Sequence, residues 1–454
     1  MKGLPHCTFY GEETTLNKPS AVALLPLLFF LALFIGTGAV LTANGTNMAF
    51  YQLSAAVAIL PAIAISLILG KVRNGQRLEK QLAVFIEGVG DSNIITMCII
   101  YLLAGGFASV ATAIGGVSST VNLGLDLVPA SFVLPGLFLI GAFVSTAMGT
   151  SMGTIAAIAP IAVGVGEQTT IGLPLLMGAV LGGAMFGDNL SMISDTTIAA
   201  TRTQGCEMKD KFRVNLYIAL PAAVLAVVAF AVLGADGAVK TAGDYSILKA
   251  LPYLIILGMA VAGVNVFVVL ASGIVFTGAV GLLTLPEYSL LTFSQDIFNG
   301  FKGMQEIMVL SMLIGGLGEL IRTQGGIKWL LERIDALTKG SKSNPQRTGE
   351  LSIAGLVSVA DACTANNTVA IILTGGLAKD IADKNNIDPR RSASILDIFS
   401  CVFQGIMPYA AQVLLAGSIA AISPVEVVGS NYYCFILAGV GLLAIISGKP
   451  KLKP

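Results

Sequence analysis

The chain has 454 residues, of which 55% are hydrophobic and only 11% are charged. A soluble domain of ordinary composition carries about 25% charged residues, so this composition excludes an ordinary soluble enzyme and a disordered chain. The 26 basic and 26 acidic residues balance, so no net charge attracts a nucleic acid. A protein that crosses a lipid bilayer several times remains.

Long uncharged segments identify the membrane helices. About 20 apolar residues cross a bilayer as a helix. Residues 21–70 and 250–286 contain no Asp, Glu, Lys or Arg, and residues 92–166 contain only Asp126. These runs are continuous rather than alternating, which excludes a transmembrane barrel. In chain order we predict single spans at 21–41, 50–70, 92–113, 214–234, 250–267, 268–285, 303–321 and 428–447, longer elements that cross once at 172–201 and 390–421, and re-entrant segments at 130–165 and 351–379.

The remaining segments give few signals of chemistry. The first 20 residues lack the basic start and the cleavage site of a signal peptide. The six cysteines are scattered without a C-x-x-C pair, so neither disulfides nor a metal site is expected. The only histidine, His6, lies in the N-terminal tail, where we expect it to be a bystander. Residues 326–339 alternate apolar and charged side chains, which predicts an interfacial helix or a connector between domains.

Motifs of the first half recur in the second half at a nearly constant spacing, which indicates an internal repeat. The slow drift of the spacing is what small loop insertions produce. The matched features are the Gly-Gly pairs that start at Gly105 and Gly115 with those that start at Gly315 and Gly325, residues 150–154 with 364–368, and Pro174 with Pro389.

The basic residues predict the orientation of the two halves. With the spans above, all Lys and Arg residues lie on one side except Lys240, Lys249 and Lys302, and both chain ends lie on the basic side. Cytoplasmic loops carry the excess of Lys and Arg, so that side is expected to be the cytoplasm. Matching loops of the two halves have opposite charge bias, which predicts opposite orientations. Inverted repeats are typical of transporters, with the site near the membrane midplane.

The predicted fold is therefore an all-α polytopic membrane protein with two inverted-topology repeats of five spans. Each repeat contains a re-entrant hairpin and a broken helix. The expected location is the cytoplasmic membrane. We divide the chain into a cytoplasmic N-terminal tail (1–20), a first repeat (21–234), an extracytoplasmic linker (235–249), a second repeat (250–448) and a cytoplasmic C-terminal tail (449–454).

Two polar segments interrupt the re-entrant segments at corresponding places. Residues 145–154 (STAMGTSMGT) and 361–368 (DACTANNT) are poor helix formers, and unwound backbone at membrane depth is tolerated only inside protein or beside water. Hydroxyl, amide and carbonyl oxygens suit a small cation, and opposed helix N-termini suit an anion. Close helix packing is the alternative. The predicted site residues at these tips are Thr150, Ser151, Thr154, Asn366, Asn367 and Thr368, followed by Thr364 and Asp361.

A third segment, 187–197 (GDNLSMISDTT), carries two acidic residues in an apolar element. In a helix, Asp188, Ser191 and Asp195 would share one face, and we add them to the predicted site, with Asn189 in second place. Carboxylates inside a membrane mark ion sites, proton relays or ion pairs, although capping of a helix near the interface is the alternative. No Lys or Arg lies between 92 and 201, so we expect any basic partner to come from the second half.

A proton carrier must be titratable, so a carboxylate is the natural candidate. One Asp that binds either a proton or Na⁺ would be a minimal exchanger. In the second half, Asp397 precedes Met407-Pro408, where the proline breaks the helix. Asp397 is therefore a further candidate of second rank.

Residues 186–197 (FGDNLSMISDTT) resemble the signature of the NhaC family of sodium/proton antiporters, and residues 148–154 (MGTSMGT) resemble its hydroxyl-rich hairpin. The resemblance implies Na⁺ and H⁺ as exchanged ions, an elevator-like motion, a homodimer, and Asp188 and Asp195 as the matched acidic positions. Many family members have Ser-Pro within the motif, whereas Met192 follows Ser191 here. Relatives of the family move dicarboxylates or amino acids.

We therefore predict a secondary transporter that exchanges Na⁺ for H⁺. The alternative is a Na⁺- or H⁺-coupled transporter of a small carboxylate or amino acid, which the amides of Asn366 and Asn367 could bind. A membrane-embedded enzyme would need a nucleophile–base pair or metal ligands within the membrane, so we do not expect an enzyme. No resident cofactor and no nucleic-acid partner are expected. The expected partners are the bilayer, small cations and, under the alternative, a small organic acid.

Overall fold

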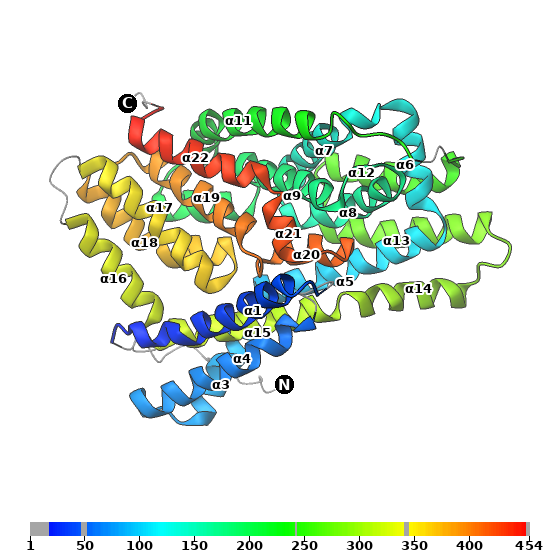
Figure 1. The fold of residues 1–454 in the computed structure, drawn as a ribbon. Coiled ribbons are helices and arrows are strands. Elements are labelled where there is room, and N and C mark those ends of the chain that lie inside the picture. Colours follow the sequence, from blue (N-terminus) through cyan, green and yellow to red (C-terminus); the bar gives the residue numbers. More distant parts are fainter. Residues whose placement is uncertain (1–17, 47–51, 241–242, 340–344, 451–454) are drawn as a thin grey trace, which may run out of the picture.

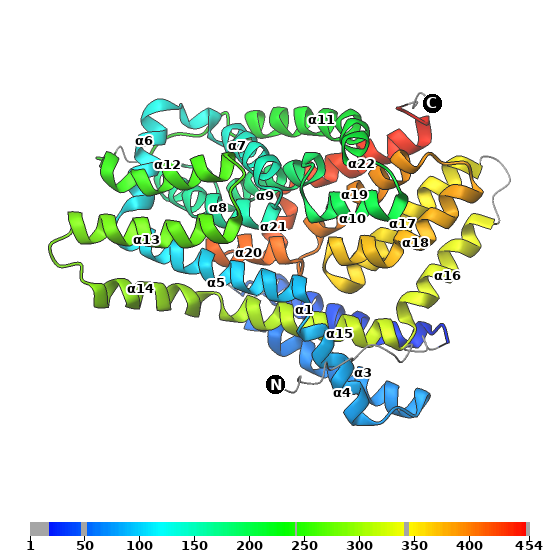
Figure 2. The ribbon, with the colours of Figure 1, turned by 180° about the vertical axis from the view of Figure 1, so that it is seen from behind.

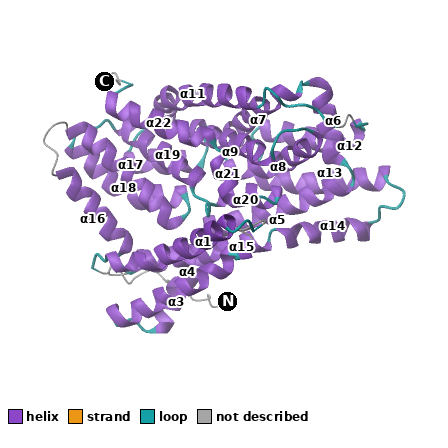
Figure 3. Cartoon of the chain, viewed as in Figure 1, coloured by secondary structure: helices purple, strands orange, loops and turns teal. Residues whose placement is uncertain are grey.

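The computed structural model describes residues 18–46, 52–240, 243–339 and 345–450, and helices dominate these residues (Figures 1 and 3). Among them, eight helices are long and apolar enough to cross a bilayer, or nine when the bent pair Leu290–Gly303 (α14) and Gln305–Thr323 (α15) counts as one further span. The predicted all-helical, multi-pass class is confirmed. His6 and most of the two predicted tails lie outside the described residues.

In the first half of the chain, the predicted polar segments 145–154 and 187–197 each contain a helix break. Its first hairpin turns at 149–150, and its long element breaks at 191–194. The helices are η1 (Ala21–Leu24), α1 (Leu25–Ala43), α3 (Ala55–Asn74), α4 (Leu78–Val89), α5 (Ser92–Ala113), α6 (Gly116–Leu127), η2 (Ala130–Phe132), α7 (Val133–Met148), α8 (Ser151–Gln168), α9 (Leu173–Leu190), α10 (Asp195–Gln204) and α11 (Met208–Leu233).

The second half contains a matching hairpin, which turns at 365–366, and a matching break at 407–410. From α5 to α11 the chain forms a long helix, a hairpin, a broken helix and a final helix, and the same order recurs from α15 to α22. The inverted orientation of the two halves stays a prediction. The other helices of this half are α12 (Ile247–Val261), α13 (Val266–Thr284), α16 (Gly326–Lys339), α17 (Pro345–Thr364), α18 (Asn367–Lys384), α19 (Pro389–Ile406), α20 (Ala411–Ala420), α21 (Pro424–Gly429) and α22 (Tyr432–Ser447).

Several predicted boundaries are wrong. Segments predicted as loops contain α4, α6 and α14, because these helices carry charged or polar side chains and a search for uncharged runs passes over them. The predicted spans 250–267 and 268–285 instead divide before α13, where the Asn265 side chain accepts a hydrogen bond from the Phe267 N–H at 3.0 Å and caps the helix. Helix α11 begins at Met208 rather than at 214, which places Lys211 inside a helix.

The helices form two groups that lie one above the other (Figures 1 and 2). In the first group, the α5 bundle, α5 packs on α13, α14 and α15, α15 packs on α3 and α4, and α1 packs on α3. In the second group, the hairpin bundle, both hairpins pack on both broken helices, the first hairpin also packs on α11, and the second also packs on α22. Helix α16 contacts α15 and α17 and so connects the bundles. Within α16, the Arg333 guanidinium lies 5.4 Å from the centre of the Trp329 ring.

Small residues set the close approach of helices within the hairpin bundle. A Cβ atom at Gly183 would overlap the Phe138 carbonyl, and one at Gly187 would overlap the Ser145 side chain. The backbones of α7 and α9 are therefore in near contact along their length, as small residues allow between membrane helices. This packing fixes the first hairpin beside Asp188, which immediately follows Gly187.

Candidate ion and substrate site

Each hairpin tip is built from a left-handed residue followed by a helix N-cap. Gly149 has a φ of +73° and ends α7. The Thr150 hydroxyl then accepts a hydrogen bond from the Gly153 N–H at 3.4 Å. At the second tip, Ala365 has a φ of +50°, and the Asn366 side chain accepts from the Val369 N–H at 3.0 Å. The N-termini of α8 and α18, with their partial positive charges, therefore begin at the tips.

The two tips border one small cavity of about 80 Å³ between the hairpin bundle and α5. Oxygen and amide groups from four helices and two tips converge there, so the cavity joins residues that are distant in sequence. The lining consists of Asn93, Thr96, Met97 and Ile100 of α5, Gly149, Thr150, Ser151 and Met152 of the first tip, Asp188, Asp195 and Thr196 of the first broken helix, Asn366, Asn367 and Thr368 of the second tip, and Gln412 of α20.

Asp188 is the buried carboxylate of this cavity. Its exposed fraction is 5%, and its Oδ2 atom accepts a hydrogen bond from the Ser151 hydroxyl at 3.2 Å. Asp195, the other acidic lining residue, begins α10 and is exposed. The described lining contains no Lys or Arg. An ionised Asp188 therefore meets oxygen ligands and no competing cation at the cavity wall.

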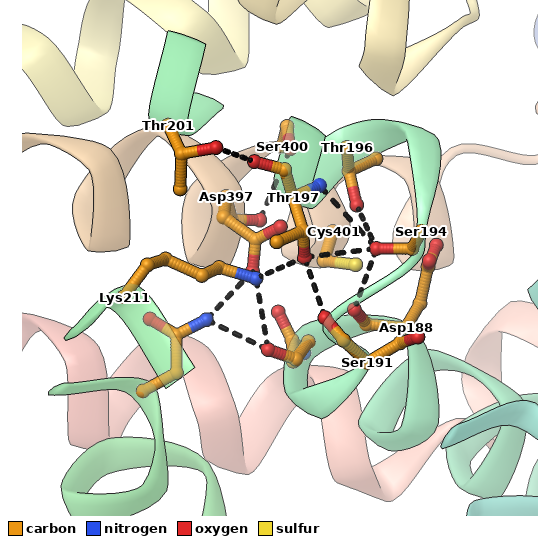
Figure 4. Close-up of polar contacts among 12 residues, drawn as sticks. Asp188, Ser191, Ser194, Thr196, Thr197, Thr201, Lys211, Asp397, Ser400 and Cys401 are labelled. Atoms are coloured by element: carbon orange, nitrogen blue, oxygen red, sulfur yellow. Dashed lines mark hydrogen bonds and ion pairs between the residues drawn. The ribbon is translucent and has the colours of Figure 1, made fainter. Parts of the chain in front are cut away.

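The break between α9 and α10 exposes backbone carbonyls, and a polar network satisfies them (Figure 4). The Lys211 ammonium donates to the Asn189 carbonyl at 3.0 Å and to the Thr197 hydroxyl at 2.7 Å. Thr197 in turn donates to the Ser191 carbonyl at 2.7 Å, and Ser194 donates to the Asp188 carbonyl at 3.3 Å. Buried backbone acceptors need such partners, so this network holds the break open.

Lys211 also forms a buried ion pair across the two halves of the chain. Its Nζ atom lies 2.8 Å from Asp397 Oδ2, and both side chains are 0% exposed. Asn215, one turn further along α11, donates to the same Asp397 oxygen at 2.7 Å and to the Asn189 carbonyl at 2.8 Å. Asp188 and Asp195 form no described ion pair, so the origin of a basic partner for them stays a prediction; the buried base, Lys211, lies in the first half and pairs with Asp397.

Several predicted site residues lie off the cavity. The predicted shared helical face of Asp188, Ser191 and Asp195 does not exist, because α9 ends before Ser191 and α10 begins at Asp195. The remaining side chains are used locally: Ser191 accepts from the Ile193 N–H, Thr154 donates to the Thr150 carbonyl, Thr364 donates to the Ala360 carbonyl, and Asn189 donates to the Met185 carbonyl and the Tyr433 hydroxyl. Asp397 is in the ion pair, and Asp361 is buried beside the second tip.

The break between α19 and α20 is surrounded by amides instead of charges. The Gln404 amide donates to the Ala365 carbonyl at 3.1 Å and to Gln412 Oε1 at 2.7 Å. Gln412 donates to the Ser151 hydroxyl at 3.2 Å, and Ser151 donates to Asp188. A continuous chain of hydrogen bonds thus connects the second tip to the Asp188 carboxylate.

A second cavity of about 260 Å³ adjoins the site between α4, α5, α15 and the second hairpin. It shares Asn366 with the smaller cavity. Its walls include Glu87, Asp91 and Glu319, and Glu319 pairs with Arg322 of the same helix. An acidic space of this kind favours cations near the site.

Several residues at or behind the cavity were not predicted from the sequence. Asn93, Thr96 and Gln412 line it, and Lys211 and Asn215 brace its broken helix. Lys211 and Asn215 are spaced at i and i+4, so an α11 that extended back to Met208 would have placed them on one face. Gln412 follows the Met407-Pro408 break, which was itself visible in the sequence.

Two broken helices, two hairpin tips and a cavity lined by oxygen groups define the class of the protein as a multi-pass membrane transporter. The chain belongs to the Na⁺/H⁺ antiporter family, whose model matches residues 2–235. The resemblance to the NhaC family predicted from residues 186–197 is thereby confirmed.

Relatives over most of the chain carry different substrates in their names. The chain is 24% identical to the Bacillus subtilis malate-2H⁺/Na⁺-lactate antiporter, covering 94% of this chain and 96% of the relative. It is 24% identical to the Na⁺/H⁺ antiporter NhaC of the same organism, covering 79% and 85%. It is 25% identical to the arginine/ornithine antiporter ArcD of Halobacterium salinarum, covering 97% and 94%.

Proposed function

We propose that this protein exchanges Na⁺ for H⁺ across the cytoplasmic membrane, with both chain termini in the cytoplasm. The observation that carries the proposal is Asp188, a buried carboxylate at a cavity whose described lining offers oxygen ligands and no basic side chain. A buried charge without a counterion is unfavourable, so an ionised Asp188 has a strong preference for a bound cation. A proton bound at the site in place of Na⁺ opposes that preference, which is the competition that exchange requires.

The chemistry and the size of the cavity favour a small cation. Na⁺ binds oxygen ligands, as hard cations do, and Thr150, Ser151, Asn366, Asn367 and Thr368 supply hydroxyl or amide oxygens at the wall. A volume of about 80 Å³ holds an ion with only a few waters. No covalent chemistry and no resident cofactor are needed for this function.

The arrangement of the bundles suits an elevator-like motion. The hairpin bundle carries both tips and both broken helices, whereas the α5 bundle contributes only the Asn93, Thr96, Met97 and Ile100 wall of the cavity. A hairpin bundle that moves past α5 would expose the ion alternately on the two sides of the membrane. In this proposal the α5 bundle stays fixed in the membrane and forms the contact of a homodimer.

A specific observation also favours coupled transport of a small carboxylate or amino acid. The N-termini of α8 and α18 begin at the cavity and attract an anionic group. The Asn367 amide nitrogen is buried and has no hydrogen-bond acceptor among the described residues, so it is available to a carboxylate. The names of the malate/lactate and arginine/ornithine relatives agree with this second candidate.

The test is Na⁺-driven proton movement in proteoliposomes that contain the purified protein. An imposed Na⁺ gradient is expected to change the internal pH with the wild type. Asp188→Asn is expected to abolish this change without loss of folded protein, because a neutral amide offers Na⁺ no counterion. Asp126→Asn is the matched control, since Asp126 is exposed, accepts a hydrogen bond from Tyr245 and does not line the described cavity.

Normal exchange by Asp188→Asn would refute the assignment of this residue. A wild type that moves no protons in response to Na⁺, but takes up a labelled carboxylate or amino acid along the Na⁺ gradient, would replace Na⁺/H⁺ exchange with the second candidate.

A further inference from the structure

Asp361 is a buried carboxylate that the exchange at Asp188 leaves unused. It lies in the last turn of α17 with an exposed fraction of 0%, and neither of its oxygen atoms has a hydrogen-bond partner among the described residues. An ionised carboxylate in this state would lack both a counterion and a donor, which costs several kcal/mol or more. The group is therefore neutral, and carries a proton, in the conformation described here.

Gln404, which lies near Asp361, also has a buried polar atom without a hydrogen-bond partner. The Asp361 carboxyl group lies near the main chain of Gln404 of α19. The Gln404 amide nitrogen makes two hydrogen bonds, whereas its Oε1 atom is buried and has no donor among the described residues. Asp361 and the Gln404 side chain thus each hold a buried acceptor without a donor, and a buried acceptor needs one. A proton on Asp361 would convert one of its acceptor oxygens into a donor.

No charged side chain provides another explanation. The titratable groups that come near Asp361 are the Cys363 thiol and the Tyr409 phenol, and Tyr409 donates to the Ala362 carbonyl at 2.6 Å. On the helices that pack against α17, the charged residues with described side chains are Glu306, Glu319 and Arg322 on α15, Lys328, Glu332 and Arg333 on α16, Lys379, Asp380, Asp383 and Lys384 on α18, and Arg390, Arg391 and Asp397 on α19. None of them forms a described ion pair or hydrogen bond with the Asp361 carboxylate.

The hydrogen bonds between the two carboxylates all point the same way. Gln404 donates to Gln412, Gln412 donates to Ser151, and Ser151 donates to Asp188. Every donor in this chain faces Asp188, which favours an ionised Asp188. At the other end, Gln404 Oε1 is an acceptor without a donor, and the Asp361 oxygens, near the Gln404 main chain, also lack one. The polarity of the chain therefore suits a negative charge on Asp188 and a proton on Asp361.

We propose that Asp361 is the proton-binding group of this transporter and that Asp188 is the separate cation-binding group. When Na⁺ takes the oxygen atoms of Asp188 and Ser151, the amides of Gln412 and Gln404 reverse and turn a donor toward Asp361. The Asp361 proton then leaves as H⁺ to water. Proton and Na⁺ thus compete through the amide chain and not at a single oxygen. This inference rests on the proposed Na⁺/H⁺ exchange and assigns its proton.

The experiment measures the apparent KM for Na⁺ as a function of pH, with radioactive Na⁺ exchanging for unlabelled Na⁺ across proteoliposomes at equal pH on both sides. The wild type is expected to show a KM that rises as the pH falls, because the proton on Asp361 opposes Na⁺ binding. Asp361→Asn carries a permanent neutral amide, so its KM is expected to stay high at every pH. It should also lose Na⁺-driven proton movement while still exchanging Na⁺ for Na⁺ at saturating concentration.

Asp361→Glu is the matched variant, because it keeps a titratable carboxyl group and should retain both the pH dependence and the proton movement. The proposal is overturned if the KM of Asp361→Asn follows pH as in the wild type, or if this variant is folded and exchanges no Na⁺ even at saturation. A wild type that neither exchanges Na⁺ nor moves protons instead refutes the proposed function itself.

Infrared difference spectroscopy of the wild type covers the case in which Asp361→Asn does not fold. Addition of Na⁺ is expected to remove the stretching band of a protonated carboxyl group, and Asp361→Glu is expected to shift that band. A wild type without such a Na⁺-sensitive band contradicts the proposal.

Discussion

Both broken helices free backbone carbonyls inside the protein, and different chemical groups bind these carbonyls at the two breaks. At the break between α9 and α10, a buried ammonium group, Lys211, binds the freed Asn189 carbonyl and pairs with Asp397 of the other half. At the break between α19 and α20, neutral amides serve, and Asn431 donates to the freed Gly405 carbonyl at 2.8 Å. A buried ion pair is strongly directional and costly to separate, whereas amides exchange partners at little cost. The first break is thus a fixed brace, and the second can rearrange during transport.

The largest expected effect comes from removing the charge of the first break. Lys211→Met leaves Asp397 buried without its counterion and deprives the Asn189 carbonyl of one donor. Breaking a buried ion pair in this way costs about 3–5 kcal/mol. We expect a large fall in the amount of folded protein and in its melting temperature in detergent, with transport lost as a result.

The double variant Lys211→Met with Asp397→Leu separates the charge from the packing. Replacing both members of a buried pair by apolar residues is often neutral for stability, and Asn215 still donates to the Asn189 carbonyl. Folded protein is therefore expected to return. If the double variant is no more stable than Lys211→Met alone, the charge pair is not what holds this break.

A substitution in the amide chain at the second break should have a smaller effect, and it should weaken Na⁺ binding during transport more than it lowers stability. Gln412→Leu removes the donor to Ser151 and the acceptor for Gln404. Loss of about 1–1.5 kcal/mol of hydrogen bonding corresponds to roughly a tenfold weaker apparent Na⁺ affinity, and it would be measured as the KM for Na⁺-driven proton movement.

Gln204→Leu is the matched control for Gln412→Leu. Gln204 is also a buried amide, with hydrogen bonds to the Gly375 carbonyl at 2.9 Å, to the Thr203 hydroxyl at 3.3 Å and from the Ser392 hydroxyl at 2.7 Å, but it does not line the cavity. The control should lose stability to a similar extent and keep its KM. Equal KM changes in both variants would mean that the amide chain has no special part in Na⁺ binding.

The sequence predicted where helices are interrupted better than it predicted which side chains stabilise the interruptions. Gly149, Pro408 and the clustered hydroxyls around Thr150 disfavour helix locally, so the tips and the breaks could be found from local chemistry alone. The partner of Asp397 could not, because Lys211 lies in a segment that reads as a basic loop and becomes buried only when α11 packs on α19. Such pairing depends on tertiary contacts between halves of the chain, which no local pattern records.

The two hairpin tips offer the subtlest test of the difference between the halves. Gly149 and Ala365 both have positive φ, which costs an alanine roughly 1–2 kcal/mol and a glycine almost nothing. At Gly149 a Cβ would also lie 2.7 Å from Ile193 Cγ1, in the first break. Gly149→Ala is therefore expected to lower the melting temperature modestly and to impair exchange, because it pushes the tip away from the broken helix.

Ala365→Gly is its counterpart in the second tip. Relief of backbone strain is offset by the loss of a buried methyl group, worth about 0.8 kcal/mol, so the stability of this variant should hardly change. If Ala365→Gly proves as damaging as Gly149→Ala, both tips depend equally on the residue at the turn, and the two halves would differ in their helix breaks and not in their tips.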